Sequence, residues 1–198
     1  MDRPPLTYLI TKGESTPDNF EEKRNEVLEI IKAAVLAGIS MIQLREKRLE
    51  AKQLFELARD GVAAVSGSST KLLINGRGDI ASAAGADGVH LPEDGIRVAD
   101  VRQSYPKPFL IGASVHNVDA ARAAKDDGAD FVLFGPVFDS IGKQGKGVEM
   151  LSKVCLALGE CSVLAVGGID ETNYHLVLNA GAAGYAAIRY LNEYVRTI

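Results

Sequence analysis

The chain has 198 residues, of which 46% are hydrophobic and 24% charged, which fits one soluble globular domain or at most two small ones. Its formal net charge is −4, so no basic surface is expected for nucleic acid or for an anionic membrane. No run of about 18 apolar residues occurs, and we expect neither export nor a membrane span. Cys155 and Cys161 match no zinc spacing and predict no disulfide framework, which favours a cytoplasmic location.

A glycine-centred pattern recurs four times along the chain. In each copy an alanine-rich, helix-like segment ends at a glycine, and a short apolar segment follows. Glycine suits the left-handed position just after a helix, so each copy predicts a helix, a stop and a strand. The four glycines are Gly38, Gly85, Gly128 and Gly181, and the strands that follow them are predicted at 41–45, 89–91, 131–134 and 185–188.

Four further apolar segments predict strands between these copies. They lie at 6–10, 71–75, 109–112 and 162–166, and helical patterns at 20–36, 51–65, 117–125 and 173–179 separate the strands. Eight strands alternating with helices predict a (β/α)8 TIM barrel as a single domain over residues 1–198. An open doubly wound sheet is the alternative, but it gives no reason for the shared glycine pattern. Residues 12–19 and 138–147 are expected to form long loops, the second of them mobile.

Three polar residues follow the second predicted strand. Period-two alternation places Gln43, Arg45 and Lys47 on one face. Active sites of such barrels lie at the carboxyl ends of the strands. An amide, a guanidinium and an ammonium there suit a polyphosphate or carboxylate substrate, whereas a solvated strand end is the alternative.

Histidines stand at the ends of two other strands. His90 and His116 each flank an apolar segment, where a buried structural histidine is the common case and proton transfer the functional one. His116 is the better candidate for proton transfer because it lies two residues beyond Ser114 and projects toward the mouth of the barrel.

Asn75 and Asp94 also follow strands. Asn75 is a candidate binding residue or a cap for the next helix. Asp94 is a candidate metal ligand, although Mg²⁺ usually takes one or two carboxylates together with substrate phosphates. Lys143 lies in the loop after the sixth strand and adds a further cation.

The seventh strand ends at paired glycines. Gly167 and Gly168 allow backbone N–H groups to approach an anion, and the loops after strands seven and eight commonly hold phosphate in this barrel. Ile188 and Arg189 follow strand eight. The sequence therefore predicts a phosphate site here, with a plain turn as the alternative.

These segments together resemble the thiamine phosphate synthase/TenI family over nearly the whole chain. The matching pieces are Gln-Leu-Arg-Glu-Lys (43–47), Ile-Asn (74–75), Ala-Gly-Ala-Asp-Gly-Val-His-Leu (84–91), Gly-Ala-Ser-Val-His (112–116), Gly-Ala-Asp-Phe-Val-Leu-Phe-Gly-Pro-Val-Phe (128–138) and Val-Gly-Gly-Ile (166–169). The resemblance implies the same (β/α)8 barrel and one of two chemistries. Synthases join hydroxymethylpyrimidine diphosphate to thiazole phosphate and expel Mg²⁺-bound pyrophosphate. TenI-type members move a proton to aromatise thiazole phosphate carboxylate.

The resemblance also implies roles for particular positions. Asp94 matches one of the two metal aspartates of the synthases, whereas Gly76 stands where they carry the other, and Arg189 replaces the serine of their phosphate loop. His116 matches the proton-transfer residue of the TenI branch. The residues that match the pyrimidine and pyrophosphate contacts of the synthases are Gln43, Arg45, Lys47, Asn75, Ser114 and Lys143.

Three functions follow as hypotheses. The first is a TenI-type thiazole tautomerase, which needs no cofactor. It is favoured because Gly76 stands where synthases carry a metal carboxylate, and without that carboxylate Mg²⁺ neutralises a departing diphosphate less well. The second is an Mg²⁺-dependent thiamine phosphate synthase, favoured by Gln43, Lys47 and Asp94. The third is a noncatalytic barrel that binds a phosphate ligand. The expected partners are small molecules, thiazole phosphate and pyrimidine diphosphate, and assembly into a homo-oligomer is left open.

Overall fold

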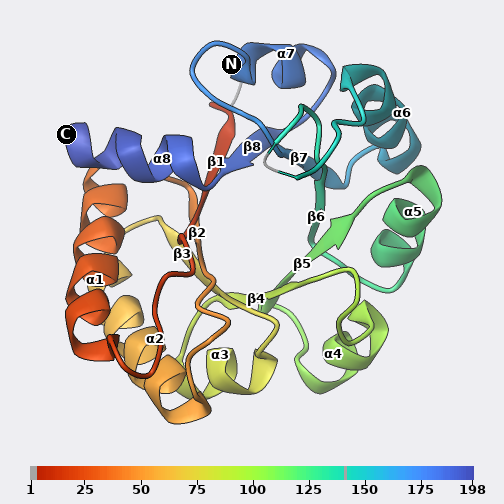
Figure 1. Cartoon of the computed structure of the whole chain (residues 1–198). Helices are drawn as coiled ribbons and strands as arrows, with labels where there is room; N and C mark the ends of the chain where they lie inside the picture. Colours follow the sequence, from red (N-terminus) through yellow and green to blue (C-terminus); the bar gives the residue numbers. More distant parts are fainter. Residues whose placement is uncertain (1–3, 141) are drawn as a thin grey trace.

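The protein is a closed eight-stranded parallel barrel surrounded by helices (Figure 1). The computed structural model describes residues 4–140 and 142–198. Each strand pairs with the next along the chain, and β1 pairs with both β2 and β8, which closes the sheet. The predicted (β/α)8 barrel is confirmed, and the open doubly wound sheet is excluded.

Strands and helices alternate through the whole barrel. The strands are β1 (Leu6–Ile10), β2 (Met41–Leu44), β3 (Lys71–Asn75), β4 (Gly88–Leu91), β5 (Leu110–Val115), β6 (Phe131–Phe134), β7 (Ser162–Val166) and β8 (Gly184–Ala187). The helices are α1 (Phe20–Leu36), α2 (Ala51–Val65), α3 (Gly78–Ala84), α4 (Val98–Ser104), α5 (Val118–Asp126), α6 (Val148–Leu158), α7 (Tyr174–Asn179) and α8 (Arg189–Tyr194), followed by the 3-10 turn Val195–Thr197.

The predicted element ends need correction at several places. Strand β2 ends at Leu44, one residue before the predicted end, and β8 ends at Ala187 instead of residue 188. Strand β5 extends to Val115, so Ser114 lies within the strand. Asn117 lies before α5, where its side chain accepts a hydrogen bond of 2.8 Å from the amide of Ala120. Such a capping residue belongs to the helical pattern but not to the helix itself.

The four repeated glycines adopt the backbone conformation that the pattern predicts. Their φ angles are 70° at Gly38, 77° at Gly85, 100° at Gly128 and 97° at Gly181. All four lie in the left-handed region, where a side chain would be strained. Each helix of the repeat can therefore turn at once into the strand that follows it.

In two copies of the repeat the glycine is followed by Ala-Asp. Each of these aspartates stands just before a strand and accepts a hydrogen bond from the preceding strand of the sheet. Asp87 accepts from the amide of Leu72 in β3 at 2.9 Å, and Asp130 accepts from the amide of Ile111 in β5 at 2.8 Å. Arg102 of α4 donates to Asp130 at 2.5 Å. These carboxylates fix the amino ends of the strands, opposite the expected site, and their role is structural.

Replacing Asp130 with Ala is expected to lower the free energy of unfolding by about 2 kcal/mol, because it leaves the amide of Ile111 without its acceptor and removes the carboxylate partner of the half-buried Arg102, which keeps only backbone carbonyl acceptors. Urea denaturation measures this loss. Asp126→Ala is the matched control, because Asp126 is exposed at the end of the neighbouring helix α5. Equal losses in the two variants would contradict the assigned role.

Apolar side chains fill both sides of the sheet. One cluster lies between the sheet and the helices, and a second, smaller cluster includes Tyr8, Ile10, Leu73, Phe131 and Leu164 inside the barrel. This second layer closes the barrel beneath the carboxyl ends of the strands, so a ligand can enter only from that end. Among the described residues, no helix is long and apolar enough to cross a membrane.

Candidate active site

A cavity of about 1280 Å³ lies at the carboxyl ends of the strands. It brings together the candidate residues of the sequence analysis, which lie at or after the carboxyl ends of seven strands, β2 to β8, whereas Gly76 does not line it. The candidate residues that line it are Gln43, Arg45, Lys47, Asn75, His90, Asp94, Ser114, His116, Lys143, Gly167, Gly168, Ile188 and Arg189.

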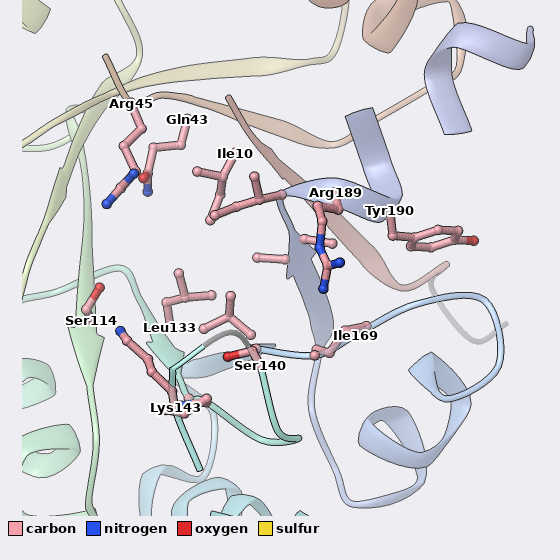
Figure 2. A pocket seen from close by; sticks show the side chains of 18 of the residues that line it. Ile10, Gln43, Arg45, Ser114, Leu133, Ser140, Lys143, Ile169, Arg189 and Tyr190 are labelled. Atoms are coloured by element: carbon pink, nitrogen blue, oxygen red, sulfur yellow. The ribbon is translucent and has the colours of Figure 1, made fainter. Parts of the chain in front are cut away.

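Gln43 and Arg45 lie on one wall of the cavity (Figure 2). Gln43 is almost fully buried, and its Nε2 donates a hydrogen bond of 3.1 Å to the hydroxyl of Tyr8. Burial raises the pKa of Tyr8 well above its usual range, so this hydroxyl stays protonated. A buried phenol thus fixes the amide of Gln43 at the edge of the site.

Arg45 lies just beyond β2, and the first loop holds its backbone. The amide of Arg45 donates to Thr11 Oγ1 at 2.9 Å, and Thr11 in turn donates to Glu46 Oε1 at 2.7 Å. The buried Glu46 also accepts from the amide of Ser15 at 2.9 Å. Lys47 is exposed at the rim. Gln43, Arg45 and Lys47 all line the cavity, on the face that strand alternation predicts. Arg45 and Lys47 nevertheless lie in the loop after β2, which Glu46 ties to the first loop by hydrogen bonds.

His90 and Ser114 meet on the wall formed by β4 and β5. Nε2 of His90 lies 2.9 Å from Oγ of Ser114. Burial lowers the pKa of His90 to about 3, so the ring is neutral at physiological pH. His90 is therefore a buried, hydrogen-bonded histidine, as the structural alternative predicts, although it also lines the cavity.

His116 follows β5 at the mouth of the cavity and is held from two sides. Its Nδ1 bonds to the carbonyl oxygen of Gly135, and its Nε2 lies 3.3 Å from Oε2 of Glu93. A carbonyl oxygen only accepts, so Nδ1 carries a proton and Nε2 is the nitrogen available for proton transfer. Sequence reasoning did not identify Glu93 as a site residue. Its position next to Asp94 in the same loop was the available signal.

Lys143 extends over the cavity from the loop between β6 and α6 (Figure 2). Two backbone hydrogen bonds join Ser140 and Lys143, of 3.0 Å and 2.8 Å, and shape a tight turn beneath the lysine. Its side chain is exposed, and in Figure 2 its amino group extends toward the strand that carries Ser114. The loop thus adds a cation near Ser114, in the part of the cavity that also contains Arg45.

The loop after β7 has the geometry of an anion site. Gly167 and Gly168 have φ angles of 99° and 66°, and an added Cβ at Gly168 would lie 2.6 Å from the carbonyl oxygen of Asp139. In the described part of the chain, the amides of Gly168, Ile169 and Arg189 donate to no protein acceptor. The guanidinium of Arg189 points into the cavity (Figure 2). Unpaired N–H groups beside an arginine suit a phosphate.

The metal ligands predicted from the sequence are incomplete. Asp94 lines the cavity, whereas Gly76 does not and offers no side chain. Across residues 4–140 and 142–198, no group of three or more His, Cys, Asp and Glu side chains is arranged to hold a metal ion. Asn75 lines the cavity, and α3 begins only at Gly78 without a side-chain cap, so the capping alternative for Asn75 is wrong.

The fold and the cavity together define a (β/α)8 barrel protein whose cavity contains two groups of positively charged and N–H donors, one around Arg45 and Lys143 and one around Gly168 and Arg189. The family model described as "Thiamine monophosphate synthase" matches residues 7–191. The chain belongs to this family, as the sequence motifs predict.

Relatives and solved structures agree with this assignment. A relative from Geobacter sulfurreducens is 40% identical over 91% of this chain and 84% of its own length. The thiamine-phosphate synthase of Chlorobium luteolum is 34% identical over 93% of this chain and 84% of its own length. The thiamine phosphate pyrophosphorylase structure from Pyrococcus furiosus superposes with a TM-score of 0.82 at 26% identity, covering 96% of this chain and 91% of that one.

Proposed function

We propose that the protein is a thiamine-phosphate synthase, which joins hydroxymethylpyrimidine diphosphate to thiazole phosphate and releases pyrophosphate. The observation that carries the proposal is that one cavity of about 1280 Å³ contains two groups of donors suited to anions, Arg45 with Lys143 and Gly168 with Arg189. A diphosphate and a monophosphate can then bind together, as a condensation of two phosphorylated substrates requires. The names of relatives such as the Chlorobium luteolum protein favour this function over the tautomerase that the sequence placed first.

The side chains divide between the two substrates. Arg45 and Lys143 are assigned to the diphosphate, where they stabilise the charge that develops as the carbon–oxygen bond breaks. Gln43, Asn75 and Ser114 orient the pyrimidine through hydrogen bonds. The cation-like pyrimidine carbon then forms its new bond with the thiazole nitrogen, whose phosphate lies against Gly168 and Arg189.

A magnesium ion fits this site only together with substrate oxygens. Asp94, which lines the cavity, is the protein carboxylate that would hold the ion together with substrate oxygens. When bound, such an ion neutralises negative charge on the leaving diphosphate.

Formation of thiamine phosphate from the two substrates, with Mg²⁺ and again with a chelator, tests the proposal. Product that forms with Mg²⁺ and disappears with the chelator supports the synthase. If a folded sample gives no product, the proposal is wrong, and proton exchange on thiazole phosphate carboxylate then separates the tautomerase, which catalyses it, from a noncatalytic barrel, which does not.

The arrangement of His116 favours thiazole tautomerisation as a second candidate. Its Nδ1 is fixed by Gly135 and its Nε2 lies 3.3 Å from Oε2 of Glu93, and both side chains line the cavity, so this pair is placed for proton exchange with a ligand. Tautomerisation also does not require a metal-binding carboxylate at position 76, because no diphosphate departs in this reaction.

His116→Asn is expected to slow proton exchange on thiazole phosphate carboxylate by about 10²–10⁴-fold, because the substituted amide cannot accept and return a proton near neutral pH. Hydrogen–deuterium exchange followed by NMR measures the rate. His175→Asn is the matched control, because His175 is exposed on α7 and does not line the cavity. Retained exchange in His116→Asn would remove this histidine from the mechanism.

A further inference from the structure

His90 is a buried imidazole that the proposed chemistry leaves without a role. It lies on β4, only 2% exposed, with the rings of Tyr8 and Phe131 at centroid distances of 5.8 Å and 6.0 Å. Gly112 of β5 lies against the side of the ring that carries Nδ1. A Cβ there would lie 2.8 Å from Nδ1 of His90 and 2.3 Å from the ring of Phe131. The ring therefore has one fixed position.

The two nitrogens of this ring have different surroundings. Nε2 lies 2.9 Å from Oγ of Ser114, whereas Nδ1 is buried and has no hydrogen-bond partner among the described residues. No ion pair to His90 forms within residues 4–140 and 142–198. Nδ1 faces the backbone of Gly112 and the surrounding aromatic rings, which offer no acceptor to an N–H group.

The hydrogen bond to Ser114 distinguishes the two neutral forms of the ring. With the proton on Nδ1, a strong donor would be buried without an acceptor, which is more costly than a buried acceptor left without a donor. With the proton on Nε2, that proton is donated to Ser114 and Nδ1 is a bare lone pair in an apolar wall. The charged form is excluded because burial lowers the pKa of His90 to about 3.

We propose that His90 is a positioning residue in the Nε2–H form, which donates to Ser114 Oγ and so directs the hydroxyl hydrogen of Ser114 into the cavity. Ser114 then acts on the substrate as a donor and selects a hydrogen-bond acceptor at that point. We assign this acceptor to hydroxymethylpyrimidine diphosphate, an assignment that rests on the proposed function. A ligand that presents an N–H group there would leave two donors opposed and bind weakly.

The tautomer is measured directly on the wild-type protein. The chain has three histidines, so a long-range proton–nitrogen NMR spectrum of protein labelled with ¹⁵N-histidine contains three ring systems. We expect one ring with Nε2 protonated and Nδ1 unprotonated, unchanged from pH 5 to pH 8, whose signals disappear in His90→Gln. A proton on Nδ1, or titration within this range, would overturn the proposal. This result does not depend on which reaction the protein catalyses.

A double-mutant cycle tests the effect on the substrate. His90→Leu and Ser114→Ala are each expected to raise KM for hydroxymethylpyrimidine diphosphate about tenfold, and the double variant is expected to lose no more than either one. His90→Gln, which keeps a donor near the position of Nε2, is expected to recover most of the loss. If the KM increases of the two single variants multiply in the double variant, or if His90→Gln recovers none of the loss, His90 does not act through Ser114.

The same set of variants can be compared by substrate binding, without measuring catalysis. Calorimetric dissociation constants for hydroxymethylpyrimidine diphosphate are expected to follow the same pattern in the four proteins. If the wild type binds this compound but makes no product, the proposed function fails while the role of His90 is still tested. If binding is unaffected in all variants, the role of His90 is wrong.

Discussion

Replacing Arg45 with Ala is expected to reduce kcat/KM for thiamine phosphate formation by about 10²–10³-fold. Arg45 is half-buried beside Gln43, and its backbone is tied to Thr11 and through it to the buried Glu46. The backbone that carries the guanidinium is therefore held in place before substrate arrives. Its two-pronged donor geometry matches the oxygens of a diphosphate, and its charge counts most when the leaving group becomes more negative.

Steady-state kinetics with each substrate varied in turn measures this loss. Arg48→Ala is the matched control, because Arg48 is an exposed cation three residues away that bonds to the carbonyl of Gly13 and does not line the cavity. Arg45→Lys is expected to fall between wild type and Ala, since a lysine keeps the charge but loses the paired donors. An equal fall in the Arg45 and Arg48 variants would mean that overall charge, and not the position of Arg45, governs the rate.

The barrel was predictable because its units repeat. Gly38, Gly85, Gly128 and Gly181 each require a backbone conformation that other residues rarely adopt, so local sequence marks four helix ends. Alternation of strands and helices then leaves few topologies. The strand ends were less predictable. Strand β2 ends at Leu44, and beyond it Glu46 bonds to Thr11 and Ser15 of the first loop, a long-range contact that no local pattern records.

The candidate residues were predictable as a set but not in their contacts. In a closed parallel barrel all the carboxyl ends of the strands face one way, so polar residues at those ends must meet. The pairing of His116 with Glu93 depends on the path of the loop after β4, and the bond from His90 to Ser114 depends on the register of β4 against β5. Such contacts follow from tertiary packing and have no signature at a single position.

Gly76→Asp is expected to lower the Mg²⁺ concentration for half-maximal synthesis about tenfold, because the ion gains a second carboxylate in addition to Asp94. The backbone leaves room for this change. An added Cβ at Gly76 meets only Pro92, at 3.8 Å. The φ angle of 66° is left-handed and costs about 1 kcal/mol for a side chain, although aspartate and asparagine tolerate it better than most residues.

Gly76→Asn separates charge from strain in this experiment. It has the same shape and the same left-handed φ angle but no negative charge, so it is expected to lose stability like the Asp variant without the gain in Mg²⁺ response. Mg²⁺ titrations of activity and thermal unfolding of both variants make the comparison. An Asp variant that responds to Mg²⁺ as the Asn variant does would mean that position 76 does not reach the ion. The low number of carboxylates would then be a feature of a site that leaves metal binding to the diphosphate itself.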